Sequence, residues 1–179
     1  MSVDEGGDDL PQRVRTGDLH LALGFEDTAR PHEPPPDLER HDLLRERFVV
    51  ALPPGHRFAD RPAIRIGDLS DDDWTAALSD GLIVRTCRAA GFTPNLVSIT
   101  HDQLAIRALI LRGLAVTLAP ELLAEAFSGI ALRPIAGAGP ARDVYALLPP
   151  GGRHPLVAPL LDALAATAAE LSRPGPLRT

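Results

Sequence analysis

The sequence predicts an α/β fold built on parallel or mostly parallel sheets. From residue 68 to residue 135, apolar segments of strand length alternate with segments of helix length. Glycine, proline and short polar side chains separate the segments, as is typical of turns and helix ends. Strands that alternate with helices need crossover connections, which place consecutive strands parallel to one another.

The N-terminal part predicts a short helix and two strands separated by a loop. Leu10 and Val14 share one helix face, and Gly17 suits a left-handed C-cap that ends the helix. Alternating leucines predict a strand at 19–23. We expect a loop over residues 24–40 because it contains four prolines, which cannot pair regularly in a sheet. A continuous apolar run then predicts a strand at 43–52.

The remaining segments each carry their own start and stop signals. Ser79 or Asp80 can cap a helix that ends at Gly91, and Thr100 or Asp102 can cap a helix that ends at Gly113. Pro120 suits the first position of a helix to Phe127, and apolar residues three or four apart predict a long helix from Leu156 to Leu171. The expected strands are 74–78, 96–99, 114–118, 130–135 and, after a flexible connection at 136–141, 144–148.

Composition excludes several classes of function. The formal net charge is −6, so the chain has no general attraction for phosphate backbones and is not expected to bind nucleic acid by itself. All basic residues are arginine, which excludes a lysine Schiff base and a Walker phosphate loop. Cys87 is the only cysteine, so no disulfide framework or CxxC pair exists. The acidic N-terminus and the absence of a long apolar run predict a cytoplasmic protein with no membrane partner.

The inventory of reactive side chains favours binding over catalysis. The six histidines lack metal-ligand spacing, and the run Asp71–Asp73 is typical of a solvated segment. Neither a GxGxxG nor a GxSxG motif is present. We therefore expect no catalytic residue, no metal site and no cofactor.

Two corners of the predicted sheet are candidate ligand sites. In an open parallel sheet, ligands bind outside the carboxyl ends of the strands, where helix N-termini point their amides. Residues 77–80 and 100–103 form such corners. Ser79, Thr100 and Asp102 can equally act as helix caps alone, so the sequence leaves both interpretations open.

Five short segments carry recognisable motifs in a fixed order: GDLHLAL at 17–23, FVVALPPGHRFA at 48–59, IGDL at 66–69 followed by Trp74, GFTP at 91–94 and ILRGLAVTLAP at 110–120. Together they resemble the effector-binding domain of LysR-type transcriptional regulators. Two positions depart from the family pattern, because His20 stands where the family has aspartate and Ala115 replaces a family glycine.

The resemblance implies a two-lobed fold akin to type 2 periplasmic binding proteins. Residues 10–42 and 136–171 would form lobe one and residues 43–135 lobe two, between an acidic disordered tail at 1–9 and a disordered tail at 172–179. The family's winged helix-turn-helix, its linker helix and the first strand–helix–strand of lobe one have no counterpart in the sequence. We therefore expect the first lobe to be incomplete, and DNA to be contacted only through a domain that this chain lacks.

The same resemblance implies a small organic effector held between the lobes of a homo-oligomer. The helix N-termini at the two corners favour an anionic or aromatic effector. Effector binding would control transcription through the DNA-binding domain. A stand-alone small-molecule binding protein is the alternative. An enzyme on the same scaffold is disfavoured because the sequence offers no set of catalytic side chains. The expected effector contacts are Leu23 and Phe25 from lobe one, with Leu78, Ser79, Thr100 and Gln103 from lobe two.

Overall fold

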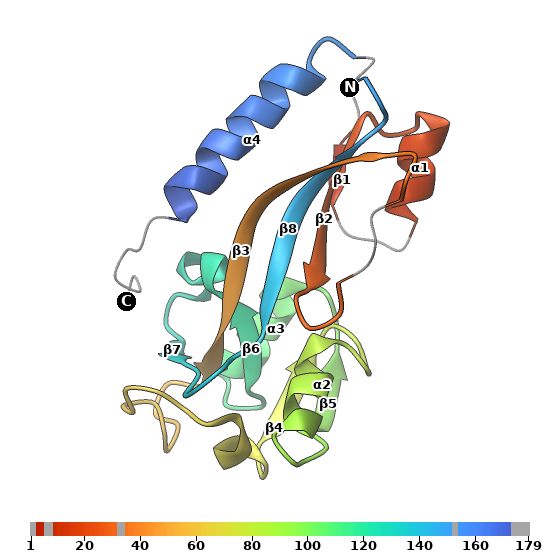
Figure 1. Cartoon of the computed structure of the whole chain (residues 1–179). Helices are drawn as coiled ribbons and strands as arrows, with labels where there is room; N and C mark the ends of the chain where they lie inside the picture. Colours follow the sequence, from red (N-terminus) through yellow and green to blue (C-terminus); the bar gives the residue numbers. More distant parts are fainter. Residues whose placement is uncertain (1–2, 6–8, 32–34, 152–153, 173–179) are drawn as a thin grey trace. The chain divides into compact units, whose positions relative to one another are not determined.

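The computed structural model describes residues 3–5, 9–31, 35–151 and 154–172. The chain divides into two compact units (Figure 1). The first consists of Met1–Glu46 and Ala141–Gly175, and the second of Arg47–Pro140. The long strand β3 (Glu39–Leu52) therefore begins in the first unit and ends in the second.

The sheet of the first unit is covered by a helix on each face (Figure 1). Its strands are β1 (Val3–Glu5), β2 (Leu21–Asp27), β8 (Ala141–Leu148) and the start of β3, in that order. Strand β1 pairs parallel to β2, and β8 pairs antiparallel to β2. Helices α1 (Leu10–Thr16) and α4 (Val157–Leu171) cover the two faces.

Alternating side chains of β2 supply the two faces of this sheet. Ala22 packs with Leu10 and Val14 of α1, whereas Leu21 packs with Val157 of α4. Helix α1 ends as the sequence predicts, because Gly17 adopts a left-handed conformation with a φ of 82° and its N–H donates to the Val14 oxygen at 3.2 Å.

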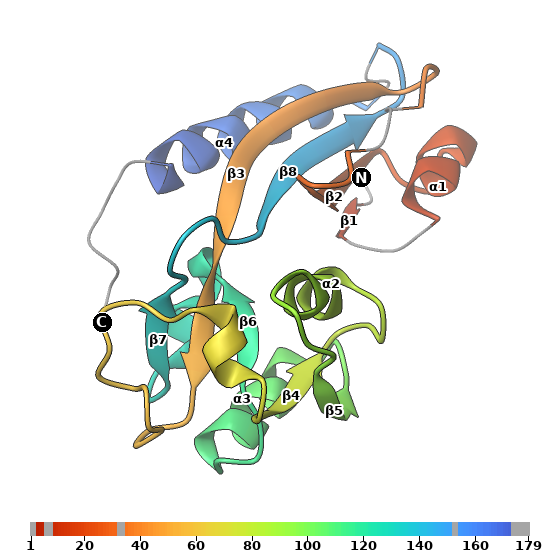
Figure 2. The ribbon, with the colours of Figure 1, turned by 60° about the horizontal axis from the view of Figure 1, so that its bottom comes forward.

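The second unit combines an antiparallel and a parallel strand set (Figure 2). The end of β3 pairs antiparallel with β6 (Thr117–Pro120) on one edge and β7 (Ala131–Pro134) on the other. Strands β4 (Asp73–Ala76) and β5 (Asn95–Ile99) form a parallel pair, and Trp74 bridges in parallel to Val116. The helical elements are η1 (Ile66–Leu69), α2 (Leu82–Ala89), α3 (Gln103–Leu111), η2 (Glu121–Leu123) and η3 (Glu125–Phe127).

Two buried clusters pack on the two sides of β3 in this unit. Val50 and Leu52 face a cluster that contains Trp74 and Cys87 of α2. The alternate residues of β3 face a second cluster that contains Ile106 of α3. Consecutive side chains of a strand point to opposite faces, so the continuous apolar run of β3 is explained by burial on both sides.

The predicted α/β class is confirmed, but the prediction of mostly parallel sheets is wrong. Strands β2 and β8 pair antiparallel, as do β3 with β6 and β3 with β7. Helical crossovers impose parallel pairing only on consecutive strands such as β4 and β5. The longest strand, β3, instead pairs with strands that come much later in the sequence and run in the opposite direction.

Most predicted elements are present, with some boundaries displaced. The loop expected over 24–40 is too long, because β2 continues to Asp27 against β8 and β3 already begins at Glu39. Only part of the segment expected as a strand at 114–118 belongs to β6, which starts at Thr117. The expected strands at 43–52, 74–78, 96–99, 130–135 and 144–148 correspond to β3, β4, β5, β7 and β8.

Two further expectations fail. In place of a helix from Pro120 to Phe127, the chain forms the 3₁₀ turns η2 and η3, whose tighter bonding does not propagate. In place of an acidic disordered tail at 1–9, residues 3–5 form β1 because they find a partner strand in β2. Residues 1–2 and 6–8, and the tail from 173 onward, lie outside the described residues.

Candidate functional site

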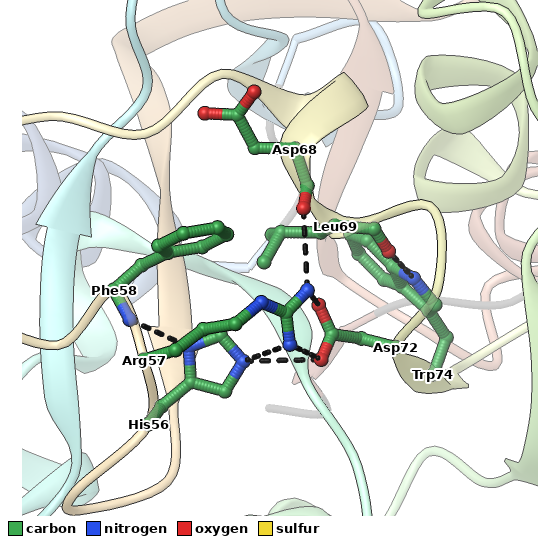
Figure 3. Close-up of polar contacts among 7 residues, drawn as sticks. All are labelled: His56, Arg57, Phe58, Asp68, Leu69, Asp72 and Trp74. Carbon is green, nitrogen blue, oxygen red and sulfur yellow. Dashed lines mark hydrogen bonds and ion pairs between the residues drawn. The ribbon is translucent and has the colours of Figure 1, made fainter.

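A cluster of polar contacts anchors the segment that leads into β4 (Figure 3). The Arg57 guanidinium donates to both carboxylate oxygens of Asp72, each at 2.7 Å. His56 lies on the same carboxylate, with Nε2 3.0 Å from Oδ1. The Trp74 indole N–H donates to the Leu69 oxygen at 3.2 Å. These contacts fix the start of β4 and thereby the register of the corner that follows it.

A main-chain hydrogen bond determines the tautomer of His56. Its Nδ1 accepts the Phe58 N–H at 3.2 Å, so the proton of the neutral ring is on Nε2. That N–H donates to Asp72, which explains why the ring points at the carboxylate in Figure 3.

Beyond β4 and β5, four of the six predicted effector contacts follow neighbouring strand ends. Ala76 pairs with the end of β5, and the Thr100 N–H donates to the Ala76 oxygen at 3.0 Å. Leu78 and Ser79 lie in the turn after β4, Thr100 directly follows β5, and Gln103 is the first residue of α3. The carboxyl ends of a parallel pair share one edge, so the structure brings these residues to the same edge.

At the α3 corner, the polar side chains form hydrogen bonds with main-chain groups of the same corner. Asp102 caps α3, with Oδ1 accepting the Leu104 N–H at 2.8 Å, as the sequence predicts. Thr100 Oγ1 accepts the Asp102 N–H at 3.1 Å. Gln103 donates from Nε2 to the main-chain oxygen two residues before it, at 3.4 Å. The positive end of this helix is therefore already matched by the Asp102 carboxylate.

The α2 corner is built differently, and the predicted caps Ser79 and Asp80 are wrong. The N-cap is Gly81, and no side chain within the described residues caps the helix. A side chain at Gly81 would meet Leu78, because its Cβ would lie 3.0 Å from the Leu78 Cβ. Glycine thus lets the chain turn closely into α2 and leaves the amides of its first turn open to a ligand.

Charge also distinguishes the two corners. Arg85 stays at the α2 corner, where Nη1 donates to the Asp80 oxygen at 2.8 Å. Arg107 of α3 instead donates to the Ser128 oxygen at 2.7 Å. Leu78 is 52% exposed beside the open helix end. The α2 corner therefore offers backbone amides, an apolar surface and the Arg85 cation, with the exposed Asp80 carboxylate beside them. The open amides and the cation suit a small molecule with an anionic group.

The other two predicted contacts belong to the first unit. Leu23 packs at the edge of the cluster formed with α4. Phe25 is half exposed, and the Arg142 guanidinium carbon lies 4.5 Å from the centre of its ring.

Reactive groups are few in the described part of the chain. No group of three or more His, Cys, Asp or Glu side chains there can hold a metal ion. Cys87 is fully buried, and burial raises the pKa of its thiol to about 12. The sequence analysis missed the open start of α2, because Ser79 and Asp80 both fit the pattern of a cap and only the backbone reveals that Gly81 takes this position.

The family model described as "LysR substrate binding domain" matches residues 1–169 of the chain. The chain is a member of this LysR family. The five-motif resemblance is thereby confirmed, and the chain is a small-molecule-sensing module of the LysR type. LysR domains of this kind form a regulatory family and not a class of enzymes.

Two curated relatives are regulatory proteins of greater length. The small neutral protease regulatory protein of Streptomyces coelicolor is 33% identical over 168 residues, which cover 89% of this chain and 51% of the relative. The transcriptional dual regulator GltC of Bacillus subtilis is 30% identical over 121 residues, 63% of this chain and 37% of GltC. The chain thus spans about half or less of these relatives.

Solved structures share the fold. The effector-binding domain of QuiR in complex with shikimate superposes with a TM-score of 0.71 at 16% identity, over 92% of this chain and 79% of that domain's chain. The reduced OxyR regulatory domain from Pseudomonas aeruginosa gives a TM-score of 0.70 at 23% identity, over 93% and 78%. Within the described ranges, each helix is too short or too polar to cross a membrane.

Proposed function

We propose that this chain senses a small organic anion on behalf of a cytoplasmic LysR-type transcriptional regulator. The observation that carries the proposal is the uncapped N-terminus of α2, which follows exposed Leu78 and Ser79 at the carboxyl end of β4. DNA contacts would come from a part of the regulator outside this chain, and the regulator would act as a homo-oligomer without catalytic activity.

The electrostatic difference between the two helices supports the anionic class. Asp102 occupies the N-terminus of α3 with a carboxylate of the chain itself, so a ligand carboxylate is favoured at α2. Ser79 supplies a hydroxyl donor and Arg85 a positive charge at that corner. The complex of QuiR with shikimate, a small carboxylate, supports the same class.

The remaining predicted contacts would surround the rest of the effector. Leu78 would pack against the apolar body of the effector, and Thr100 and Gln103 would border it at the adjoining strand end. Leu23 and Phe25, which the family resemblance assigns to the effector, stay part of the proposal. The two compact units would correspond to the two lobes that the resemblance implies, 10–42 with 136–171 and 43–135. Effector binding would change the relative populations of conformations that the attached DNA-binding domain distinguishes.

A chemical-shift titration of the whole ¹⁵N-labelled chain tests this proposal. Benzoate serves as the probe because it joins a carboxylate to a flat apolar ring, and benzamide serves as its neutral counterpart. We expect benzoate to shift the amides of residues 79–84, and benzamide to leave them unchanged. Benzoate shifts confined to the first turn of α3, or none at either corner, would overturn the proposal.

A further inference from the structure

A pocket of about 330 Å³ lies within the first unit and involves none of the predicted effector contacts. The end of α1, the residues just before β2 and β3, and the segment between β8 and α4 surround it. Val14, Leu19 and Leu38 give it a buried apolar wall, and two prolines, Pro149 and Pro150, line another side. Its volume is at the lower end of the range for small-molecule sites, about 300–1,000 Å³.

The charged wall of this pocket is internally neutralised. Arg15 donates to Asp37 through Nε at 2.5 Å and through Nη2 at 2.8 Å. This paired geometry holds the pKa of the Asp37 carboxyl below its ordinary value. The pair therefore presents no net charge to a ligand at neutral pH.

The donor in the pocket is the ring of His154. Its Nδ1 accepts the Leu156 N–H at 3.2 Å, so the neutral ring carries its proton on Nε2. Loss of solvent around the ring lowers the pKa of His154, and the neighbouring His20 side chain lowers it further. The two imidazole rings lie edge to face, with centroids 4.9 Å apart. His154 is therefore held as a neutral Nε2–H donor.

The second unit contains the same histidine turn with its donor in use. His56 accepts the N–H two residues ahead through Nδ1, as His154 does, and its Nε2 donates to Asp72. For the Nε2–H of His154, the described residues provide no corresponding acceptor. A proton on Nε2 also makes this nitrogen unsuitable as a metal ligand, since a metal needs the lone pair.

We propose that this pocket binds a neutral, planar, single-ring molecule that accepts a hydrogen bond from His154 Nε2. The ring of the ligand would lie against the apolar wall at Val14 and Leu38. The Arg15–Asp37 pair excludes a preference for either charge, so the ligand class differs from the anion proposed for the α2 corner. The pocket is thus a second, independent site in the same chain.

Three single-ring probes of similar size that differ in charge test the ligand class: benzamide, benzoate and benzylammonium. The measurement is a chemical-shift titration of the whole ¹⁵N-labelled chain. We expect benzamide to shift the amides of Thr16, Gly17, His20 and Leu156 more strongly than either charged probe does. Equal shifts from all three probes, or no shift of these amides up to the solubility of benzamide, would overturn the proposal.

Two variants test the residues. In His154→Asn, the amide oxygen can still accept the Leu156 N–H in an Asx turn, but the ring donor is lost. We expect benzamide affinity to fall about tenfold, the effect of one hydrogen bond of about 1.4 kcal/mol. His41→Asn, at an exposed histidine of β3 outside the pocket, is the matched control and should leave affinity unchanged.

Asp37→Asn tests the neutralisation of the wall. Removing the carboxylate leaves the Arg15 charge uncompensated, so benzoate should gain affinity relative to benzamide. This variant keeps an oxygen that can accept from Arg15. An unchanged preference in Asp37→Asn, or unchanged benzamide binding in His154→Asn, would contradict the assigned roles.

Discussion

Two threonines that are neighbours in the second unit should respond in opposite ways to the same substitution. Thr75 of β4 and Thr117 of β6 are both buried, with exposures of 0% and 2%. Thr117 Oγ1 donates to the Thr75 main-chain oxygen at 2.7 Å. Thr75 Oγ1 is buried without a hydrogen-bond partner among the described residues. Valine has nearly the shape of threonine, so the substitution exchanges a hydroxyl for a methyl group at each position.

The expected magnitudes follow from these contacts. A buried hydroxyl without a partner costs about 1–3 kcal/mol, so Thr75→Val should raise the free energy of unfolding by about 1 kcal/mol. The main-chain bond from the Thr75 N–H to the Val116 oxygen does not depend on the side chain. Thr117→Val loses a hydrogen bond and should lower the free energy of unfolding by about 1 kcal/mol. The two variants should therefore differ by about 2 kcal/mol.

Urea unfolding followed by tryptophan fluorescence measures this difference. Trp74 is the only tryptophan and is fully buried, so its emission reports on the core next to Thr75. The midpoints should move in opposite directions while the slopes stay equal to that of the parent chain. If Thr75→Val were destabilised as much as Thr117→Val, the Thr75 hydroxyl would have a partner and the reasoning would be refuted.

Three further predictions concern other sites. Gly24→Ala should lower the midpoint of thermal unfolding, with a cost of about 1–3 kcal/mol, because the added Cβ would lie 2.5 Å from the ring of Tyr145; unchanged stability would contradict this packing. Cys87 should react with a thiol reagent only when the chain unfolds, as measured by labelling in increasing urea; rapid labelling of the native chain would show that the thiol is accessible. The hydrogen bonds from Arg45 lower the pKa of Asp143, so their contribution to stability is present above about pH 4 and is lost as the pH falls further. The difference in stability between the parent chain and Asp143→Asn should therefore shrink as the pH falls below about 4. A difference that stays constant over that range would contradict the prediction.

The local patterns of the sequence predict the elements better than their pairing. Gly17 and Asp102 act as the caps that their residue types indicate, since capping depends on neighbouring backbone groups alone. The antiparallel pairing of β3 with β6 and β7 depends on contacts between distant segments. No local signal in the apolar run of β3 distinguishes parallel from antiparallel partners, because burial on both faces gives the same pattern.

In the candidate sites, too, local features were predictable from the sequence and features that depend on the folded backbone were not. Sequence motifs place Ser79 and Thr100 after neighbouring strands, and the structure agrees. Which helix end is open was not predictable, because Ser79, Asp80 and Asp102 have equivalent capping chemistry and backbone geometry decides among them. The pocket beside His154 was also missed, since it joins segments far apart in the sequence and its histidines have no motif spacing.

The most direct test of the central claim is the benzoate affinity of two variants at Ser79, measured by chemical-shift titration of the whole chain. Ser79 is exposed, so aspartate and asparagine can both replace it without disturbing the core. If the open N-terminus of α2 receives the anion, Ser79→Asp should bind benzoate several-fold more weakly than Ser79→Asn. The aspartate adds like-charge repulsion of about 1 kcal/mol at this exposed position, whereas asparagine is neutral and keeps a hydrogen-bond donor. Equal affinities of the two variants would contradict anion recognition at this corner.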